Sequence, residues 1–165
     1  MDPYQIFDAR ACGAGGALLI LRMLDETRVV EMLDAAGEAG LFVLLEAFDA
    51  EDLARARSLV DRAGASSSRP CVLVGLNCRD LATMAVEPSR LAIPAAEFPA
   101  GAARVAESGI ETPAGAARVA ELGYDLALVG RALMRAEDPR AAVRDMLEAG
   151  RAARQGHGES PCISA

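Results

Sequence analysis

The sequence predicts an α/β fold, namely part of a (β/α)8 TIM barrel in which five parallel strands alternate with helices. One observation is a set of short apolar runs without polar alternation, which is the pattern of parallel strands covered on both faces. A second is that segments with helical spacing lie between these runs, so that strand and helix units repeat along the chain. The expected strands are residues 17–21, 41–45, 71–76, 103–106 and 126–129.

A helix is expected in every gap between these strands, and cap residues mark where several helices start. A small polar residue accepts hydrogen bonds from the first free N–H groups of a helix, and proline fits its first turn. Residues 27–39 also place apolar side chains at spacings of three, on one helix face. The start signals are Asp2-Pro3, Asp49, Thr112-Pro113 and Asp138-Pro139, and the last helix is expected from Pro139 to about Arg154.

The chain of 165 residues is too short for a complete barrel of eight units, which usually takes about 250 residues. We therefore expect a partial TIM barrel over residues 1–154. Residues 155–165 contain Gly, Ser and Pro without periodicity, which predicts a flexible tail. An open, flavodoxin-like sheet of five strands fits the same length, and the side chains at the strand ends must decide between the two folds.

The composition argues against several classes of function. A formal charge of −7 disfavours nonspecific binding to nucleic acid or to an anionic membrane, and no apolar run is long enough to span a bilayer. The four cysteines form no C-x-x-C pair and the chain has one histidine, so no metal site is expected. All 17 basic residues are arginines, which removes lysine as a catalytic side chain. A reduced, cytoplasmic setting is the corresponding expectation.

Polar side chains end the second and third apolar runs, where the chemistry of βα folds is located. Glu46 ends the second run, and the partly desolvated mouth of a barrel would raise its pKa, which suits a general base. Asn77 ends the third run and Arg79 follows it; together they offer a neutral hydrogen-bonding group and a fork for a carboxylate. The alternative is a surface glutamate, with a turn-forming asparagine beside a solvated arginine.

The loops after the fourth and fifth runs are rich in small residues. They read Glu107-Ser108-Gly109 and Gly130-Arg131. Small residues let backbone N–H groups approach an oxyanion closely, and the loops after the last two strands of TIM barrels frequently hold phosphate. Each loop alone would also fit an ordinary βα turn, but the pair on successive strands favours a phosphate site.

Four motifs in series resemble indole-3-glycerol phosphate synthase in order and spacing, over nearly the whole chain. They are Asp2-Pro3-Tyr4-Gln5-Ile6, residues 74–81 with Asn-x-Arg-Asp-Leu, residues 106–110 with Glu-Ser-Gly-Ile, and residues 128–130 with 133–135. The resemblance implies strands four to eight of a (β/α)8 barrel. It also implies a lyase of tryptophan biosynthesis, which closes the indole ring of 1-(2-carboxyphenylamino)-1-deoxyribulose 5-phosphate with loss of CO₂ and water and uses no cofactor.

The resemblance assigns roles to individual residues by position. Glu46 matches the general base of the dehydration, and Asn77 matches a residue that orients the substrate and the catalytic groups. Arg79 matches a charged group of the same pocket, and Glu107 matches a substrate-contacting carboxylate. The phosphate-holding loops correspond to Ser108, Gly109, Gly130 and Arg131.

The chain also departs from the family pattern. Cys78 stands where many members have a second asparagine, and Arg131 stands where a small or hydroxyl residue is common. The family's general acid is a lysine just upstream of the Asp-Pro-Tyr-Gln motif, whereas here Met1 directly precedes Asp2 and the chain has no lysine. Arginine is a poor substitute because its pKa stays above about 12.

Three interpretations follow from these residues. The first is the synthase, represented by a shortened gene product. The second is a noncatalytic phosphate-binding half-barrel that needs a partner chain. The third is another phosphate barrel, such as a phosphoribosyl isomerase, against which Glu46 and the Asn77-x-Arg79 motif argue. Because a five-strand piece leaves two apolar strand edges without barrel neighbours, we also expect self-association or pairing with a partner through these edges.

Overall fold

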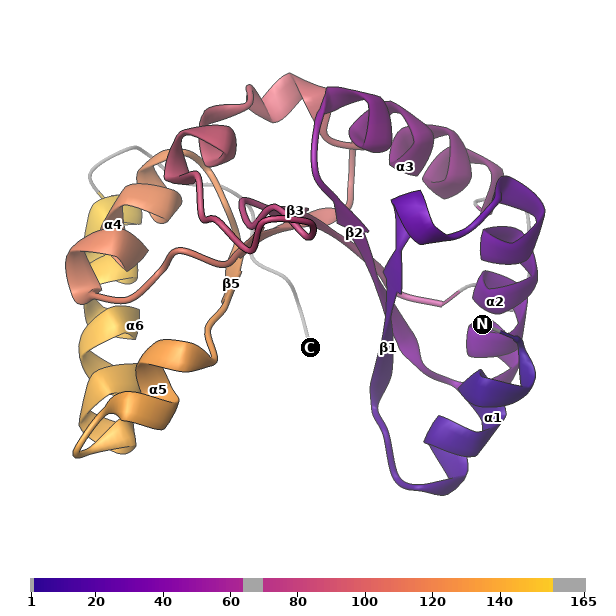
Figure 1. Ribbon diagram of the computed structural model, residues 1–165, viewed down its shortest axis with the longest axis horizontal. Helices are drawn as coiled ribbons and strands as arrows, with labels where there is room; N and C mark the ends of the chain where they lie inside the picture. Colours follow the sequence, from indigo (N-terminus) through magenta and orange to yellow (C-terminus); the bar gives the residue numbers. More distant parts are fainter. Residues whose placement is uncertain (1, 64–69, 156–165) are drawn as a thin grey trace.

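The computed structural model describes residues 2–63 and 70–155 of the chain. Its sheet has five parallel strands in the order β1-β2-β3-β4-β5. The strands curl into an open arc whose outer side is covered by helices (Figure 1). The predicted α/β fold with alternating strands and helices is thereby confirmed, and every strand lies within two residues of its expected bounds: β1 Gly16–Ile20, β2 Phe42–Ala47, β3 Val72–Asn77, β4 Ala103–Glu107 and β5 Leu126–Leu128.

The helices begin where the cap residues predict. Asp49 accepts a hydrogen bond from the Asp52 N–H (2.9 Å), Thr112 from the Gly115 N–H (3.1 Å), and Asp138 from the Ala141 N–H (3.0 Å). Such contacts satisfy N–H groups that have no partner inside the helix. The helices are α1 Tyr4–Ala11, α2 Glu26–Ala39, α3 Ala50–Ala63, α4 Pro113–Glu121, α5 Arg131–Arg135 and α6 Pro139–Gln155. Gln155 extends α6 one residue beyond its expected end, and the rest of the predicted tail lies outside the described residues.

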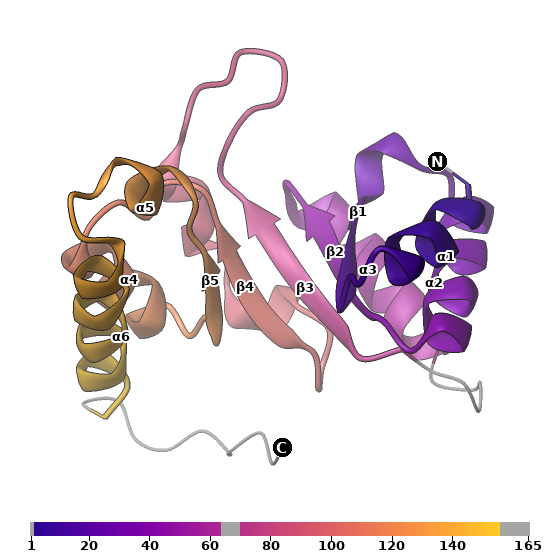
Figure 2. The same cartoon turned by 90° about the horizontal axis from the view of Figure 1, so that it is seen from below.

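The connection between β3 and β4 contradicts the expectation of a helix in every gap. Residues 78–102, all of which are described, form only two short 3-10 helices, η2 Pro88–Ala92 and η3 Ala95–Glu97, with no α-helix. Three prolines at 88, 94 and 99 explain the difference, because proline removes a backbone donor and disfavours helical conformation in the residue before it. The part of this segment that follows β3 projects past the carboxyl ends of the strands (Figure 2), and the rest returns to the start of β4.

The hydrophobic core lies between the outer face of the sheet and the helices. Outward-facing side chains of β2 and β3, such as Val43, Leu45, Val74 and Leu76, are fully buried there. The opposite, concave face is apolar as well, but it remains open. Its most exposed large side chains are 42–51% accessible to solvent; they are Leu18, Phe42, Leu126 and Leu128.

Candidate functional site

Three polar side chains lie at the carboxyl ends of the three central strands. Glu46 comes from β2, Asn77 ends β3 and Glu107 ends β4. Parallel pairing places Glu46 level with Gly75, and Asn77 level with Glu107. Because all strands run in the same direction, these side chains meet at one edge of the sheet, and all three are buried. Burial of polar groups at this position needs specific partners.

Asn77 connects two of the groups that the sequence predicts to act together. Its Nδ2 donates a hydrogen bond to Glu46 Oε1 (2.8 Å), and its Oδ1 accepts one from the backbone N–H of Arg79 (2.8 Å). The second bond fixes which way the amide points, so the first bond is directed at the carboxylate. Burial raises the pKa of Glu46, while the hydrogen bond from Asn77 opposes that rise. An oriented carboxylate with a raised pKa can act as a general base near neutral pH.

Glu107 lies in a different environment from Glu46. It is 2% exposed, and its Oε1 has no hydrogen-bond partner among the described residues. Burial, and to a smaller extent the nearby charge of Glu46, together raise the pKa of Glu107 to about 8. Glu107 is therefore mostly protonated at pH 7, and a neutral carboxyl group can donate a hydrogen bond to an oxygen atom of a ligand.

The loop after β4 has a left-handed backbone at two successive residues. Ser108 has φ +68° and Gly109 has φ +72°. A Cβ atom on Gly109 would lie 3.0 Å from Cys78 Sγ and 3.1 Å from Val86 Cγ1, so tight contacts as well as the left-handed backbone favour glycine here. Small residues leave the backbone of such a loop open to a close approach by an anion.

The loop after β5 carries the other two residues predicted to hold phosphate. Gly130 precedes the short helix α5 and has open space where a side chain would begin. Arg131 follows it and is exposed, so its guanidinium group is accessible. Arg79 is partly buried instead, and its Nη1 donates to the carbonyl of Met84 (3.2 Å). Arg79 is thus attached to the loop after β3 while it lines the site.

One cavity of about 320 Å³ is lined by all eight residues that the sequence singles out. They are Glu46, Asn77, Arg79, Glu107, Ser108, Gly109, Gly130 and Arg131. Sequence reasoning missed other parts of the lining, among them Leu18 of β1, Leu128 of β5 and Glu111. The two leucines belong to ordinary apolar runs, and only the register of the sheet places them level with the central strands.

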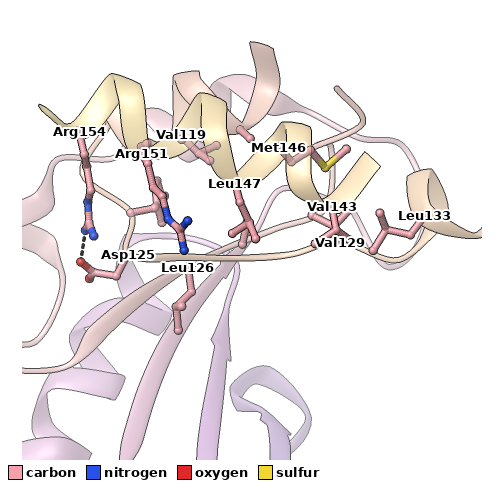
Figure 3. Close-up of a pocket in the computed structure, with 15 residues that line it drawn as sticks. Val119, Asp125, Leu126, Val129, Leu133, Val143, Met146, Leu147, Arg151 and Arg154 are labelled. Atoms are coloured by element: carbon pink, nitrogen blue, oxygen red, sulfur yellow. Dashed lines mark hydrogen bonds and ion pairs between the residues drawn. The ribbon is translucent and has the colours of Figure 1, made fainter. Parts of the chain in front are cut away.

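A larger cavity, of about 470 Å³, lies between β5 and helices α4 and α6 (Figure 3). Its walls are mainly apolar, with Val129, Met146 and Leu147 among the side chains that face one another. The charged groups at one end include Asp125 and Arg154, which are paired with each other. None of the eight predicted residues lines this cavity, so we place the candidate site in the smaller one.

Within residues 2–63 and 70–155, no group of three or more His, Cys, Asp or Glu side chains is arranged to hold a metal ion. None of the helices in the same ranges combines the length and apolar character needed to cross a membrane.

Solved structures share this fold. A native KDPGal structure has a TM-score of 0.64 and 18% identity, and the match covers 94% of this chain and 67% of that one. The 3-hexulose-6-phosphate synthase from Salmonella typhimurium has a TM-score of 0.63 and 21% identity, covering 94% and 68%. At these identities the likeness concerns the fold alone. Fold and site together define the chain as a section of a parallel βα barrel, with its polar groups gathered at the carboxyl ends of the strands.

The sequence identifies the family within this class. A family model described as indole-3-glycerol phosphate synthase matches residues 1–146, and the chain belongs to that family. The indole-3-glycerol phosphate synthase of Mycobacterium avium (strain 104) is 39% identical over 150 residues, which cover 91% of this chain and 52% of the relative. The enzyme of that name from Streptomyces griseus is 41% identical over 147 residues, which cover 89% and 51%. The chain therefore spans about half the length of these relatives.

Proposed function

We propose that this chain supplies the general base and the phosphate-holding loops of an indole-3-glycerol phosphate synthase. This lyase of tryptophan biosynthesis closes the indole ring of 1-(2-carboxyphenylamino)-1-deoxyribulose 5-phosphate and releases CO₂ and water. The observation that carries the proposal is the convergence of all eight residues on one cavity, with Asn77 directed at Glu46. The reaction is an acid–base rearrangement, so it requires no metal or organic cofactor.

The phosphate of the substrate would lie beside the loops after β4 and β5. Ser108, Gly109 and Gly130 offer backbone N–H groups there, and the exposed guanidinium group of Arg131 adds positive charge on the same side of the cavity. Glu46 and Asn77 line the same cavity from the ends of β2 and β3. An extended phosphorylated substrate would therefore have its reacting atoms near Glu46 when its phosphate is in these loops.

Glu46 would remove a proton during the dehydration, with Asn77 holding its carboxylate in place. Arg79 lines the cavity close by and can meet the carboxylate of the substrate. Glu107 can donate a hydrogen bond to a substrate oxygen because it is mostly protonated at pH 7, as its pKa of about 8 requires. Glu46 and Glu107 can thus serve as base and as hydrogen-bond donor because their surroundings affect their pKa values differently.

We infer that turnover also requires groups from a complementary part of the barrel. The chain contains no lysine, whereas the resemblance implies a lysine as the general acid of ring closure. Within the described residues, the concave face of the sheet is open, and β1 and β5 each pair with one neighbouring strand. The apolar cavity beside β5 adds a surface against which further βα units could pack (Figure 3). A noncatalytic phosphate-binding half-barrel is the second candidate, favoured by the same lack of lysine.

The proposal is tested by measuring indole-3-glycerol phosphate formation with the purified chain, alone and mixed with the N-terminal half of the Mycobacterium avium relative. We expect no turnover by the chain alone and turnover in the mixture. Glu46→Gln should lower turnover of the mixture by about 10²- to 10⁴-fold, which is the usual contribution of a general base. Glu51→Gln, an exposed position on α3, is the matched control and should leave it unchanged.

Two results would contradict this account. Turnover by the chain alone that disappears in Glu46→Gln would show that no complementary part is needed. A mixture that forms a stable complex and binds inorganic phosphate, yet makes no product, would favour the noncatalytic half-barrel.

A further inference from the structure

Gly75 lies inside β3, in the middle of the sheet. It pairs with Glu46 of β2 on one side and with Val105 of β4 on the other. Glycine weakens a strand, and inside a strand it often marks a bulge, a tight bend or a place where another group approaches closely. Gly75 does not have a left-handed backbone, so its conformation would accept any residue. The reason for a glycine here must therefore be space.

The space above Gly75 is filled by the side chain of Glu107. A Cβ atom on Gly75 would lie 1.8 Å from Glu107 Oε1 and 2.8 Å from Glu107 Cδ. Real Cβ atoms essentially never come within 3.0 Å of such atoms. The next nearest atom is Leu44 Cδ1 at 3.2 Å, a much milder contact. Any residue other than glycine at position 75 would therefore displace the Glu107 carboxyl group.

Glu107 belongs to β4 and Glu46 belongs to β2, with β3 between them. The side chain of Glu107 extends over β3 toward Glu46. Glu46 pairs with Gly75 in the register of the sheet, and its charge acts on Glu107. The other titratable side chains that line the cavity are Arg79, Glu111 and Arg131. The outer strands β1 and β5 contribute Leu18 and Leu128 instead. Glu46 is engaged by Asn77, while Glu107 Oε1 has no partner among the described residues.

We propose that Gly75 is a positioning residue: its missing side chain lets the Glu107 carboxyl group lie across β3 toward Glu46, while Glu107 itself lines the cavity in which a ligand would bind. The part that concerns the ligand rests on the proposed function, whereas the placement of Glu107 by Gly75 does not. In this arrangement Glu46 is the proton acceptor and Glu107 is the neutral donor. Because Gly75 leaves room for Glu107 near Glu46, the charge of Glu46 helps to keep Glu107 protonated.

A double-mutant cycle tests the placement without any assay of activity. Gly75→Ala is measured in the natural chain and in a Glu107→Ala background, with the denaturation midpoint as the readout at fixed protein concentration. We expect Gly75→Ala to lower the midpoint in the natural chain and to lose most of that effect once the carboxyl group is gone. Equal effects in the two backgrounds would overturn the proposal. Gly15→Ala is the control, because a Cβ atom there meets nothing within 4 Å. Its effect on the denaturation midpoint should be the same in the natural chain and in the Glu107→Ala background.

The titration of Glu107 provides a second readout, which does not depend on whether Gly75→Ala folds. In protein labelled with ¹³C at the glutamate carboxyl carbons, Glu107→Gln identifies the Glu107 signal, which should titrate near pH 8 in the natural chain. An ordinary carboxyl titration of that signal would overturn the proposal. In folded Gly75→Ala the midpoint should fall, because the displaced carboxyl group regains water and leaves Glu46. A Gly75→Ala signal unchanged from the natural chain would also overturn it.

The pH dependence of turnover connects the placement to function. In the active mixture, kcat/KM should fall as pH rises through the Glu107 titration, and Gly75→Ala should move this alkaline limb to lower pH. An alkaline limb that does not move would contradict the role of Glu107 as the neutral donor. If the mixture never turns over, the proposed function fails, while the stability cycle and the ¹³C titration still decide the placement.

Discussion

Glu46 and Glu107 are the same residue type in the same cavity, and their neighbours make them chemically different. Asn77 donates a hydrogen bond to Glu46, which favours its ionised form. Glu107 receives no such bond within the described part of the chain, and it lies where ionised Glu46 disfavours a second negative charge. Two carboxyl groups with separated pKa values can serve as base and acid at the same pH.

At the residue scale, the pKa of Glu107 predicts how stability depends on pH. Folding raises this pKa from 4.5 to about 8, so the folded chain binds more protons than the unfolded chain between these values. The contribution of Glu107 to the free energy of unfolding is therefore fully present below pH 4.5 and is lost as pH rises through 8. Its slope reaches at most about 1.4 kcal/mol per pH unit.

This dependence is measured by urea denaturation across the same pH interval. As pH rises, the natural chain should lose unfolding free energy relative to Glu107→Gln, because the variant has no carboxyl group to ionise at position 107. Glu51→Gln, on the exposed side of α3, should run parallel to the natural chain. If the curve for Glu107→Gln is also parallel to that of the natural chain, folding does not raise the pKa of Glu107.

That the eight candidate residues lie together could be predicted from the sequence, because the end of a parallel strand is a fixed place in a βα fold. Glu46, Asn77 and Glu107 each close an apolar run, and the structure brings all three to one cavity. The function of Gly75 could not be predicted in the same way. It depends on the path of the Glu107 side chain across a neighbouring strand, which no local pattern encodes.

At the element scale, the connection between β3 and β4 shows how a segment without an α-helix is held in place. The Tyr124 hydroxyl group donates a hydrogen bond to the carbonyl of Leu91 in η2 (3.0 Å), and both residues are buried. The ring of Tyr124 also meets Phe98 edge-on, with ring centroids 5.6 Å apart. A residue near the start of β5 thus anchors a segment that precedes β4.

Tyr124→Phe tests this anchor. The substitution keeps the ring and leaves the buried Leu91 carbonyl without its donor, which should lower the free energy of unfolding by about 1–3 kcal/mol. Denaturation with urea measures the loss. Tyr4→Phe is the matched control, because Tyr4 is 71% exposed and should tolerate the change. Equal stability of the two variants would mean that the hydrogen bond to Leu91 does not hold the segment.

The strands and most helices could be predicted because apolar runs and cap residues are local signals. Asp49, Thr112 and Asp138 each cap a helix as expected. The expectation of a helix in residues 78–102 was wrong because three prolines there oppose a helix, although the repeat of βα units predicts one. The contacts of Tyr124 that replace a helix there join residues 33 positions apart, a separation that local patterns cannot show.

At the scale of the whole molecule, the arc of strands has an open inner face. Apolar side chains from β1, β2 and β5 are exposed on it, and in the part of the chain that the structure describes the two outer strands have one neighbour each. A closed barrel would cover such a face and remove both edges. The chain also spans only about half of its relatives, 52% in the case of Mycobacterium avium. We therefore expect the folded chain to bind further βα units through its open face and its outer strands.

The most direct test of this account is sedimentation velocity of the chain alone and mixed with the N-terminal half of the Mycobacterium avium relative. Alone, the chain should form several species whose proportions change with concentration, because its apolar face and edges associate without closure. In the mixture, a single species with one copy of each part should replace them and melt cooperatively. A monodisperse monomer that melts cooperatively by itself, and whose sedimentation is unchanged by the added half, would contradict the claim that these residues need complementary βα units to complete a barrel.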